Sequence, residues 1–234
     1  MKLLLFAINI EQRKAVNAWE RIKYRKNKGE KVSMEHIMKA KEFFKNLKVV
    51  LSKKEEFKTL YHDNTKWTGF IKGITEEMIG KNCISREYYR IDSLKYQYTD
   101  FYQSYDKDNH RKYFGKHYLS TYNWKNIYAI EYENDSRNWT DELVKLSHIR
   151  SDLKVIIAYS EWNGSRKNYL SLIDKKMTFA IELLENCQKE ALNDKWLIIF
   201  GPCGSAGKEE YDKDLISHFI GYEMNDGHFV KIEA

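Results

Sequence analysis

The clearest alternation of hydrophobic and polar positions lies between residues 126 and 159. Residues 126–135 (NIYAIEYEND) alternate with a period of two, which predicts a β-strand with large apolar side chains on one face and Glu131 and Glu133 on the other. Residues 139–149 have the apolar spacing of a helix, and residues 153–159 (LKVIIAY) form an apolar run typical of a buried strand. The pattern therefore predicts a strand–helix–strand unit, whose strands tend to be buried on both faces.

Weaker periodicity predicts the remaining elements. Helical spacing recurs in residues 34–51, 67–80 and 175–192, and strand patterns occur in residues 88–98 and 196–200. Residues 219–232 predict a hairpin that turns at Asn225-Asp226-Gly227, and residues 99–125 predict loops or short strands.

These elements place the chain in the α/β class, with a mixed central sheet flanked by helices. The 234 residues are 42% hydrophobic and 32% charged with one proline, a composition that excludes a disordered chain. We expect a basic, mainly helical N-terminal region over residues 1–60 and an α/β domain over residues 61–234.

The positive charge is concentrated in the first quarter of the chain. Residues 1–60 contain 16 Lys and Arg against 7 Asp and Glu, whereas the whole chain contains 40 against 34. The densest run includes Arg21, Lys23, Arg25, Lys26 and Lys28, close to Trp19 and Tyr24. Such a run suits contacts with the phosphates of a nucleic acid. The alternative is a solvated helix or loop face without a ligand.

The cysteines and the N-terminus predict a cytoplasmic protein. Cys83, Cys187 and Cys203 are odd in number and far apart, as expected for reduced thiols. The apolar run over residues 3–8 is too short to cross a bilayer and predicts a strand or a buried helical turn.

Glu131 and Glu133 are the strongest candidates for chemistry. Carboxylates two residues apart on a strand lie roughly 7 Å apart, and burying both in charged form is costly unless a cation lies between them. A divalent metal ion is one such cation. Two alternatives remain open: the glutamate face of an edge strand can be solvated, or Lys or Arg side chains can pair with both carboxylates.

These segments resemble the central part of the PD-(D/E)XK nuclease superfamily. Its members place an Asp on one strand and Glu-x-Lys on the next, followed by a helix and a further strand. Here Asp92, in the segment Glu87-Tyr88-Tyr89-Arg90-Ile91-Asp92, matches the Asp, and Glu131 matches the Glu. The resemblance covers residues 67–200 and implies a restriction-endonuclease-like αβββαβ core, with the helix at 67–80 as its first element.

The chain departs from the superfamily pattern at the lysine. Glu133 stands where the lysine is expected, and the segment between Asp92 and Glu131 is long. Some members place the lysine on the following helix, where Lys145 matches. The alternative for Lys145 is an exposed lysine paired with Asp141 four residues earlier. Glu142 fits either a further metal-site carboxylate or an acidic residue in the first helical turn.

The resemblance implies a nuclease that hydrolyses phosphodiester bonds, with double-stranded DNA as its first expected partner and RNA as an alternative. Asp92, Glu131 and Glu133 are then the expected ligands of Mg²⁺, for which Mn²⁺ can substitute, and Lys145 joins them as a catalytic residue. A restriction or other defence endonuclease is the biological role suggested by analogy, and double-strand cleavage implies a homodimer. The rival function is a non-catalytic module that binds nucleic acid or another partner and retains the fold.

A glycine-rich segment, residues 200–209 (FGPCGSAGKE), does not match a nucleotide-binding phosphate loop. That loop requires a glycine where this chain has Pro202, and Ser or Thr where it has Glu209. We expect a flexible connection there, with residues 204–208 able to contact a nucleic-acid backbone.

Overall fold

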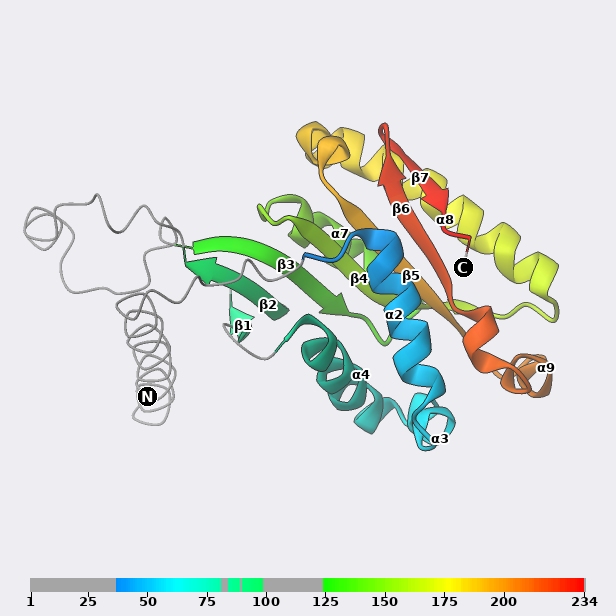
Figure 1. Ribbon diagram of the computed structural model, residues 1–234. Coiled ribbons are helices and arrows are strands. Elements are labelled where there is room, and N and C mark those ends of the chain that lie inside the picture. The colour runs from blue at the N-terminus through cyan, green and yellow to red at the C-terminus, as the bar shows by residue number, and fades with distance from the viewer. Residues whose placement is uncertain (1–36, 81–83, 89, 99–123, 234) are drawn as a thin grey trace, which may run out of the picture. The chain divides into compact units, whose positions relative to one another are not determined.

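One mixed β-sheet organises this computed structural model, which describes residues 37–80, 84–88, 90–98 and 124–233 (Figure 1). The described residues contain seven strands that lie side by side in sequence order. They are β1 (Ile84–Tyr88), β2 (Ile91–Tyr98), β3 (Trp124–Tyr132), β4 (Leu153–Glu161), β5 (Trp196–Cys203), β6 (Ile220–Asn225) and β7 (His228–Lys231). Residues 38–95 and 126–234 form one compact unit, which is described below; most of the second unit, residues 1–37 and 96–125, lies outside the described residues.

The centre of the sheet is parallel. β3 pairs with β4 and β4 pairs with β5 in parallel, so that Glu131 lies opposite Ile156, and Ile156 opposite Ile198. All residues of β4 and β5 are buried except the last of each strand. The predicted strand–helix–strand unit with doubly buried strands is therefore confirmed.

Antiparallel hairpins flank the parallel centre. β1 pairs with β2, and β6 pairs with both β5 and β7. Asp226 and Gly227 connect β6 to β7 with positive φ angles of 48° and 77°, as in the tight turns that join hairpin strands. This confirms the predicted hairpin.

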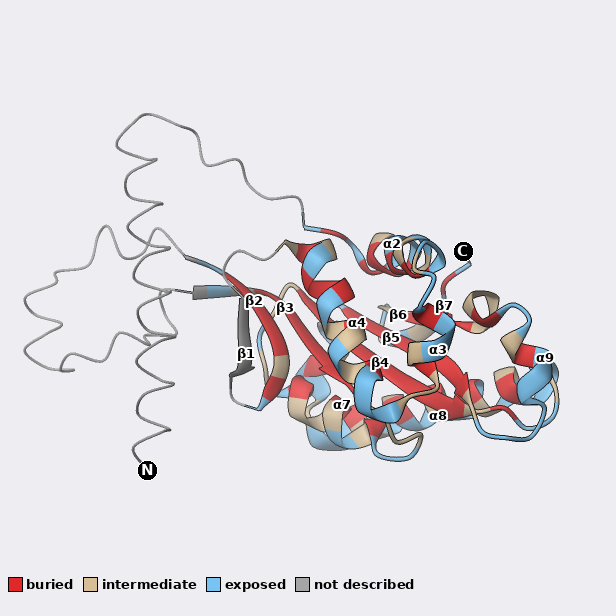
Figure 2. Cartoon of the chain, turned by 90° about the horizontal axis from the view of Figure 1, so that it is seen from below, coloured by how far each residue is buried: buried red, intermediate tan, exposed pale blue. Residues whose placement is uncertain are grey.

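Helices cover both faces of the sheet (Figure 2). One face is covered by α2 (Ala40–Ser52), α3 (Phe57–Tyr61) and α4 (Asn64–Ile79), and the other by α7 (Trp139–Ser147) and α8 (Arg166–Cys187). Two 3₁₀ helices, η2 (Lys189–Asn193) and η3 (Leu215–His218), and the short helix α9 (Lys208–Asp212) complete the described elements.

The two faces of β3 separate as the alternation predicts. The hydroxyl of Tyr128 accepts a hydrogen bond from the Met38 amide (2.7 Å), and the hydroxyl of Tyr132 pairs with Thr75 of α4. Glu131 points the other way and meets Lys145 of α7. β3 ends at Tyr132, so Glu133 lies just beyond the strand rather than in it, although its amide still donates to Ile157 O at 3.0 Å.

The largest difference from the predicted elements is the start of α8, because the sequence pattern predicts a helix only from residue 175. The helix begins at Arg166 because Ser165 caps it, with Ser165 Oγ accepting a hydrogen bond from Asn168 N at 3.3 Å. The residues that α8 buries continue the helical spacing toward this cap: Tyr169, Ile173, Met177, Ala180 and Leu184. The helix ends at Cys187, and residues 189–193 continue as a 3₁₀ turn instead of an α-helix.

The predicted N-terminal region, residues 1–60, contains α2. The sequence pattern predicts that this helix starts at residue 34. In the described chain it begins at Ala40, because residues 37–39 are not helical. It buries Phe43, Phe44 and Leu47 against β5, β6 and α4. Residues 1–36 lie outside the described residues, so a separate basic region there remains a prediction.

Gly221 provides a test of this packing. A Cβ at Gly221 in β6 would lie 2.9 Å from the ring of Phe44, whereas Gly69 in α4 has open space around it. We expect Gly221→Ala to lower the free energy of unfolding by about 1–3 kcal/mol through overpacking. We expect Gly69→Ala to raise it by about 0.5–1 kcal/mol, because alanine favours the helix. Urea unfolding measures both, and wild-type stability in Gly221→Ala would contradict the packing.

Candidate active site

Asp92 and Glu131 come together from β2 and β3. The Asp92 amide lies 3.4 Å from Glu131 Oε2, and Asp92 Oδ2 accepts a hydrogen bond from the Tyr132 amide at 3.0 Å. The 39 residues that separate them in sequence therefore do not separate them in the fold. The two carboxylates that the sequence singled out on neighbouring strands lie in one site.

Lys145 reaches the same site from α7. Its Nζ lies 2.9 Å from Glu131 Oε1, forms an ion pair with Glu142 one helical turn earlier, and donates a hydrogen bond to the carbonyl oxygen of Arg90 at 3.0 Å. Lys145 therefore lies against Glu131 and Glu142. Three oxygens, two of them from carboxylates, thus surround one cationic nitrogen.

Asp92 has a cationic partner of its own. Lys72 of α4 lies 3.0 Å from Asp92 Oδ1, and both side chains are mostly buried. The three carboxylates Asp92, Glu131 and Glu142 therefore face two ammonium groups.

Burial is strongest at Glu131, whose side chain is 2% exposed, while those of Lys145 and Glu142 are 29% and 20% exposed. This burial raises the pKa of Glu131 well above its ordinary value; Lys145 opposes the rise, and Glu142 and Asp92 add to it. Burial also disfavours the charge of Lys145, but the two glutamates outweigh it and raise the pKa of Lys145.

Two oxygens of the cluster lack hydrogen-bond donors. Glu131 Oε1 and Glu142 Oε2 are buried and accept no well-directed hydrogen bond from the described residues, although both are within ion-pair distance of Lys145 Nζ. Carboxylate and carbonyl oxygens are the ligands that Mg²⁺ prefers, with water completing its coordination. Glu131, Glu142 and the Arg90 carbonyl are oxygen ligands of this kind, and in this structure Lys145 Nζ occupies the point between them.

The expected ligand set of Asp92, Glu131 and Glu133 does not converge on one point. Among the described residues, no group of three or more His, Cys, Asp or Glu side chains has the arrangement of a metal site. Glu133 Oε1 instead accepts a hydrogen bond from the Asp135 amide at 2.7 Å, because the chain turns away after β3. Glu142 occupies the position beside Glu131 that the sequence assigned to Glu133.

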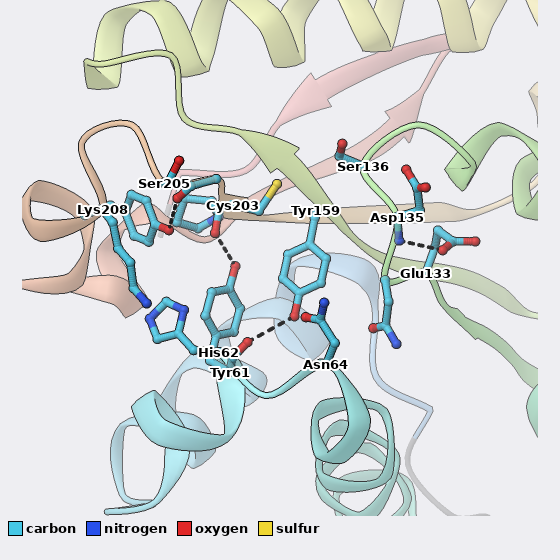
Figure 3. Close-up of a pocket in the computed structure, with 14 residues that line it drawn as sticks. Tyr61, His62, Asn64, Glu133, Asp135, Ser136, Tyr159, Cys203, Ser205 and Lys208 are labelled. Carbon is cyan, nitrogen blue, oxygen red and sulfur yellow. Dashed lines mark hydrogen bonds between the residues drawn. The ribbon is translucent and has the colours of Figure 1, made fainter.

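Glu133 lines an open cleft of about 640 Å³ (Figure 3). The cleft lies beyond the carboxyl ends of β3, β4 and β5, the position where ligands bind in open α/β sheets. Its lining comprises Tyr61, His62, Asn64, residues 133–136, Tyr159, residues 202–205, Lys208 and Tyr211.

Hydrogen bonds to the backbone fix the floor of this cleft. The Tyr61 hydroxyl donates to Pro202 O (2.7 Å), the Tyr159 hydroxyl to Tyr61 O (3.3 Å) and the Tyr211 hydroxyl to Gly204 O (2.7 Å). Glu133 and Asp135 lie at one end of the cleft, and His62 and Lys208 at the other (Figure 3). The acidic side chains of the cleft therefore lie at the end opposite His62 and Lys208.

Sequence reasoning missed several of these residues. Lys72 lies in a predicted helix and Arg90 in a predicted strand, but neither pattern shows that these residues contact Asp92 and Lys145. His62 lies in a segment without a predicted element, and only the folded chain brings it to the cleft. Glu142 had a signal, since it is one helical turn before Lys145. The predicted substrate-binding residues Arg21, Lys23, Arg25, Lys26 and Lys28 lie outside the described residues.

Comparisons with known proteins give no relative. The chain matches no protein-family model, no curated protein and no solved structure. Within the described part of the chain, no helix is long and apolar enough to cross a membrane.

The raised pKa of Glu131 has a measurable consequence for stability. A carboxyl that holds its proton more tightly when folded costs stability as pH rises above its unfolded pKa, near 4.5. In EDTA, Glu131→Gln removes this cost, so we expect the variant to become progressively more stable relative to wild type from pH 5 toward pH 8. Urea unfolding across this range measures the difference. A stability difference that does not change with pH contradicts the burial of an ionisable Glu131.

Proposed function

We propose that this protein is a metal-dependent nuclease that hydrolyses phosphodiester bonds in DNA. The observation on which this rests is the convergence of Asp92, Glu131 and Lys145, from two neighbouring strands and the following helix. These are the three residues that the resemblance to PD-(D/E)XK nucleases selects from the sequence.

The order of elements supports the same proposal. Among the described residues the elements run α4, β1, β2, β3, α7, β4, with β3 and β4 parallel, and this matches the αβββαβ order that the resemblance implies. Residues 99–123, between β2 and β3, lie outside the described residues. Asp92 is the second residue of β2, and Glu131 is the next-to-last residue of β3. A restriction-endonuclease-like core is therefore part of the proposal. Its assignment to DNA and to a restriction or defence role rests on analogy.

Each residue has a proposed role. Glu131 and Glu142, with the Arg90 carbonyl, would hold Mg²⁺ or Mn²⁺, with Asp92 beside them. When bound, the ion supplies charge stabilisation at the phosphoryl oxygens and lowers the pKa of a coordinated water. Lys145, partly exposed and positively charged, would neutralise charge that develops on the substrate phosphate. Lys72 would hold the Asp92 side chain in place through its ion pair.

Substitution of the cluster tests the activity. We expect Glu131→Gln and Lys145→Ala each to reduce metal-dependent DNA cleavage by about 10²–10³-fold, because each removes a preorganised group from the reacting centre. Supercoiled plasmid, linear duplex, single-stranded DNA and RNA are digested with Mg²⁺ or Mn²⁺. Asp141→Asn is the control, because Asp141 is an exposed carboxylate on the same helix.

The opposite outcome is equally clear. Cleavage that survives Glu131→Gln, or that falls as much in Asp141→Asn, contradicts this site. If the protein cleaves none of the four substrates but binds nucleic acid, the non-catalytic module becomes the better function. The ion pairs that Lys145 makes with both glutamates are the observation that favours that rival.

A second prediction distinguishes Glu142 from Glu133 as the ligand beside Glu131. We expect Glu142→Gln to weaken Mn²⁺ binding by at least about 10–100-fold. Loss of a residue that only supports a metal ligand already has an effect of this size, and loss of a ligand should have at least as much. Glu133→Gln should change the Mn²⁺ affinity less, because Glu133 is turned toward the Asp135 amide. Isothermal titration calorimetry without nucleic acid measures both affinities. A larger loss in Glu133→Gln restores the ligand set expected from the sequence.

A further inference from the structure

Lys145 occupies the point where the proposed active site would hold its metal ion. Its ammonium lies against Glu131, Glu142 and the carbonyl oxygen of Arg90. We propose that metal binding displaces Lys145 from this point, so that its ammonium becomes available to a substrate phosphate only in the metal-loaded protein. This inference rests on the proposed nuclease function and specifies how that site is regulated, namely by coupling between the metal ion and the substrate.

The same oxygens cannot hold both cations at once. Lys145 Nζ lies 2.9 Å from Glu131 Oε1 and 3.0 Å from the Arg90 carbonyl oxygen, and it also pairs with Glu142. At these distances the ammonium fills the space between its acceptors. Mg²⁺ binds oxygen ligands still more closely, at about 2.0–2.1 Å. A metal ion between the two glutamates therefore requires the ammonium to leave.

Lys145 matches the charge of the two glutamates better than their hydrogen bonding. It donates a hydrogen bond to the Arg90 carbonyl, whereas Glu131 Oε1 and Glu142 Oε2 are buried and accept no well-directed hydrogen bond from the described residues. A metal ion binds carboxylate oxygens directly and needs no donor hydrogen between them. The ammonium is therefore an occupant that a hard divalent cation can replace.

Lys145 is also the member of the cluster that can move. The Glu131 side chain is 2% exposed on its strand, whereas that of Lys145 is 29% exposed and has its charge on a flexible four-carbon stem. The helix α7 itself is anchored by the buried side chains of Trp139, Leu143 and Leu146. The displaced ammonium therefore stays within one side-chain length of the glutamates, where it can meet a phosphate bound beside the metal ion.

This exchange couples the two ligands of the site. In the metal-free protein, only the fraction of molecules with an unpaired Lys145 can use it to bind phosphate, and this fraction limits the affinity. Metal binding removes that limit, and by reciprocity a phosphate that holds Lys145 favours metal binding. Lys72 offers a comparison within the same site, because it pairs with Asp92 and not with the two glutamates.

Chemical labelling of lysines tests the displacement without measuring cleavage. The full-length protein is acetylated briefly in EDTA or in Mn²⁺, and mass spectrometry quantifies the labelling of each lysine. We expect labelling of Lys145 to rise about 5-fold or more in Mn²⁺, the lower end of typical coupling between two ligands. Labelling of Lys72 and of the exposed Lys167 on α8 should not change. An added 20-nucleotide duplex should protect Lys145 in Mn²⁺ but not in EDTA.

Two variants on α7 sharpen the labelling experiment. Glu142→Gln removes one of the carboxylates for which the two cations compete, so the response of Lys145 to Mn²⁺ should shrink. Asp141→Asn is the matched control, because Asp141 is exposed on the same helix, and its response should equal that of the wild type.

Calorimetry in the same buffer separates failure of the inference from failure of the proposed function. Unchanged labelling of Lys145 in a protein that binds Mn²⁺ overturns the displacement alone, and so does an equal rise at Lys72 or Lys167. Equal protection by the duplex in EDTA, or no protection in Mn²⁺, overturns the coupling to substrate. Absence of Mn²⁺ binding overturns the inference and contradicts a metal-dependent nuclease as well. The cleavage assay with Glu131→Gln decides the nuclease function separately.

Discussion

The placement of one carboxylate, that of Glu131, determines much of what is proposed for this molecule. Glu131 lies on β3, between β2 and β4 in the sheet and facing α7, and it is almost fully removed from water. A buried carboxylate must be protonated, paired or bound to a metal. Lys145 pairs with it from the helix that directly follows the strand, and Glu142 shares that lysine. The strand–helix–strand unit thus supplies the fold and also the charges of the candidate site.

The same unit explains why the cleft lies where it does. Parallel pairing of β3, β4 and β5 brings the carboxyl ends of three strands to one edge of the sheet. Residues at or just beyond these ends line the cleft together with residues in or beside α3, α4 and α9. Glu133, two residues beyond Glu131, belongs to this lining. The buried carboxylates therefore lie next to the open cleft, and the acidic end of the cleft is the end nearest the proposed metal site.

The spacing of hydrophobic residues was sufficient to predict the central elements, and the superfamily resemblance pointed to three residues that the structure brings together. β3, α7 and β4 have strong periodicity, and the superfamily resemblance selected Asp92, Glu131 and Lys145. Sequence alternation placed Glu133 on the face of Glu131, but the strand ends at Tyr132 and the glutamate turns to its own loop. The start of α8 was missed because Ser165 caps a polar first turn. Lys72 could not be predicted, because its contact with Asp92 joins α4 to β2 in the folded chain.

The central claim is that Glu131 and Glu142 hold a divalent cation, which Lys145 replaces in its absence. A crystal structure from crystals soaked in Mn²⁺, with data collected at a wavelength where manganese scatters anomalously, tests this most directly. The account predicts an anomalous peak within coordination distance of Glu131 and Glu142, with Lys145 Nζ moved away from both carboxylates. Lys145 still between the two glutamates, with no anomalous peak beside them, would contradict it.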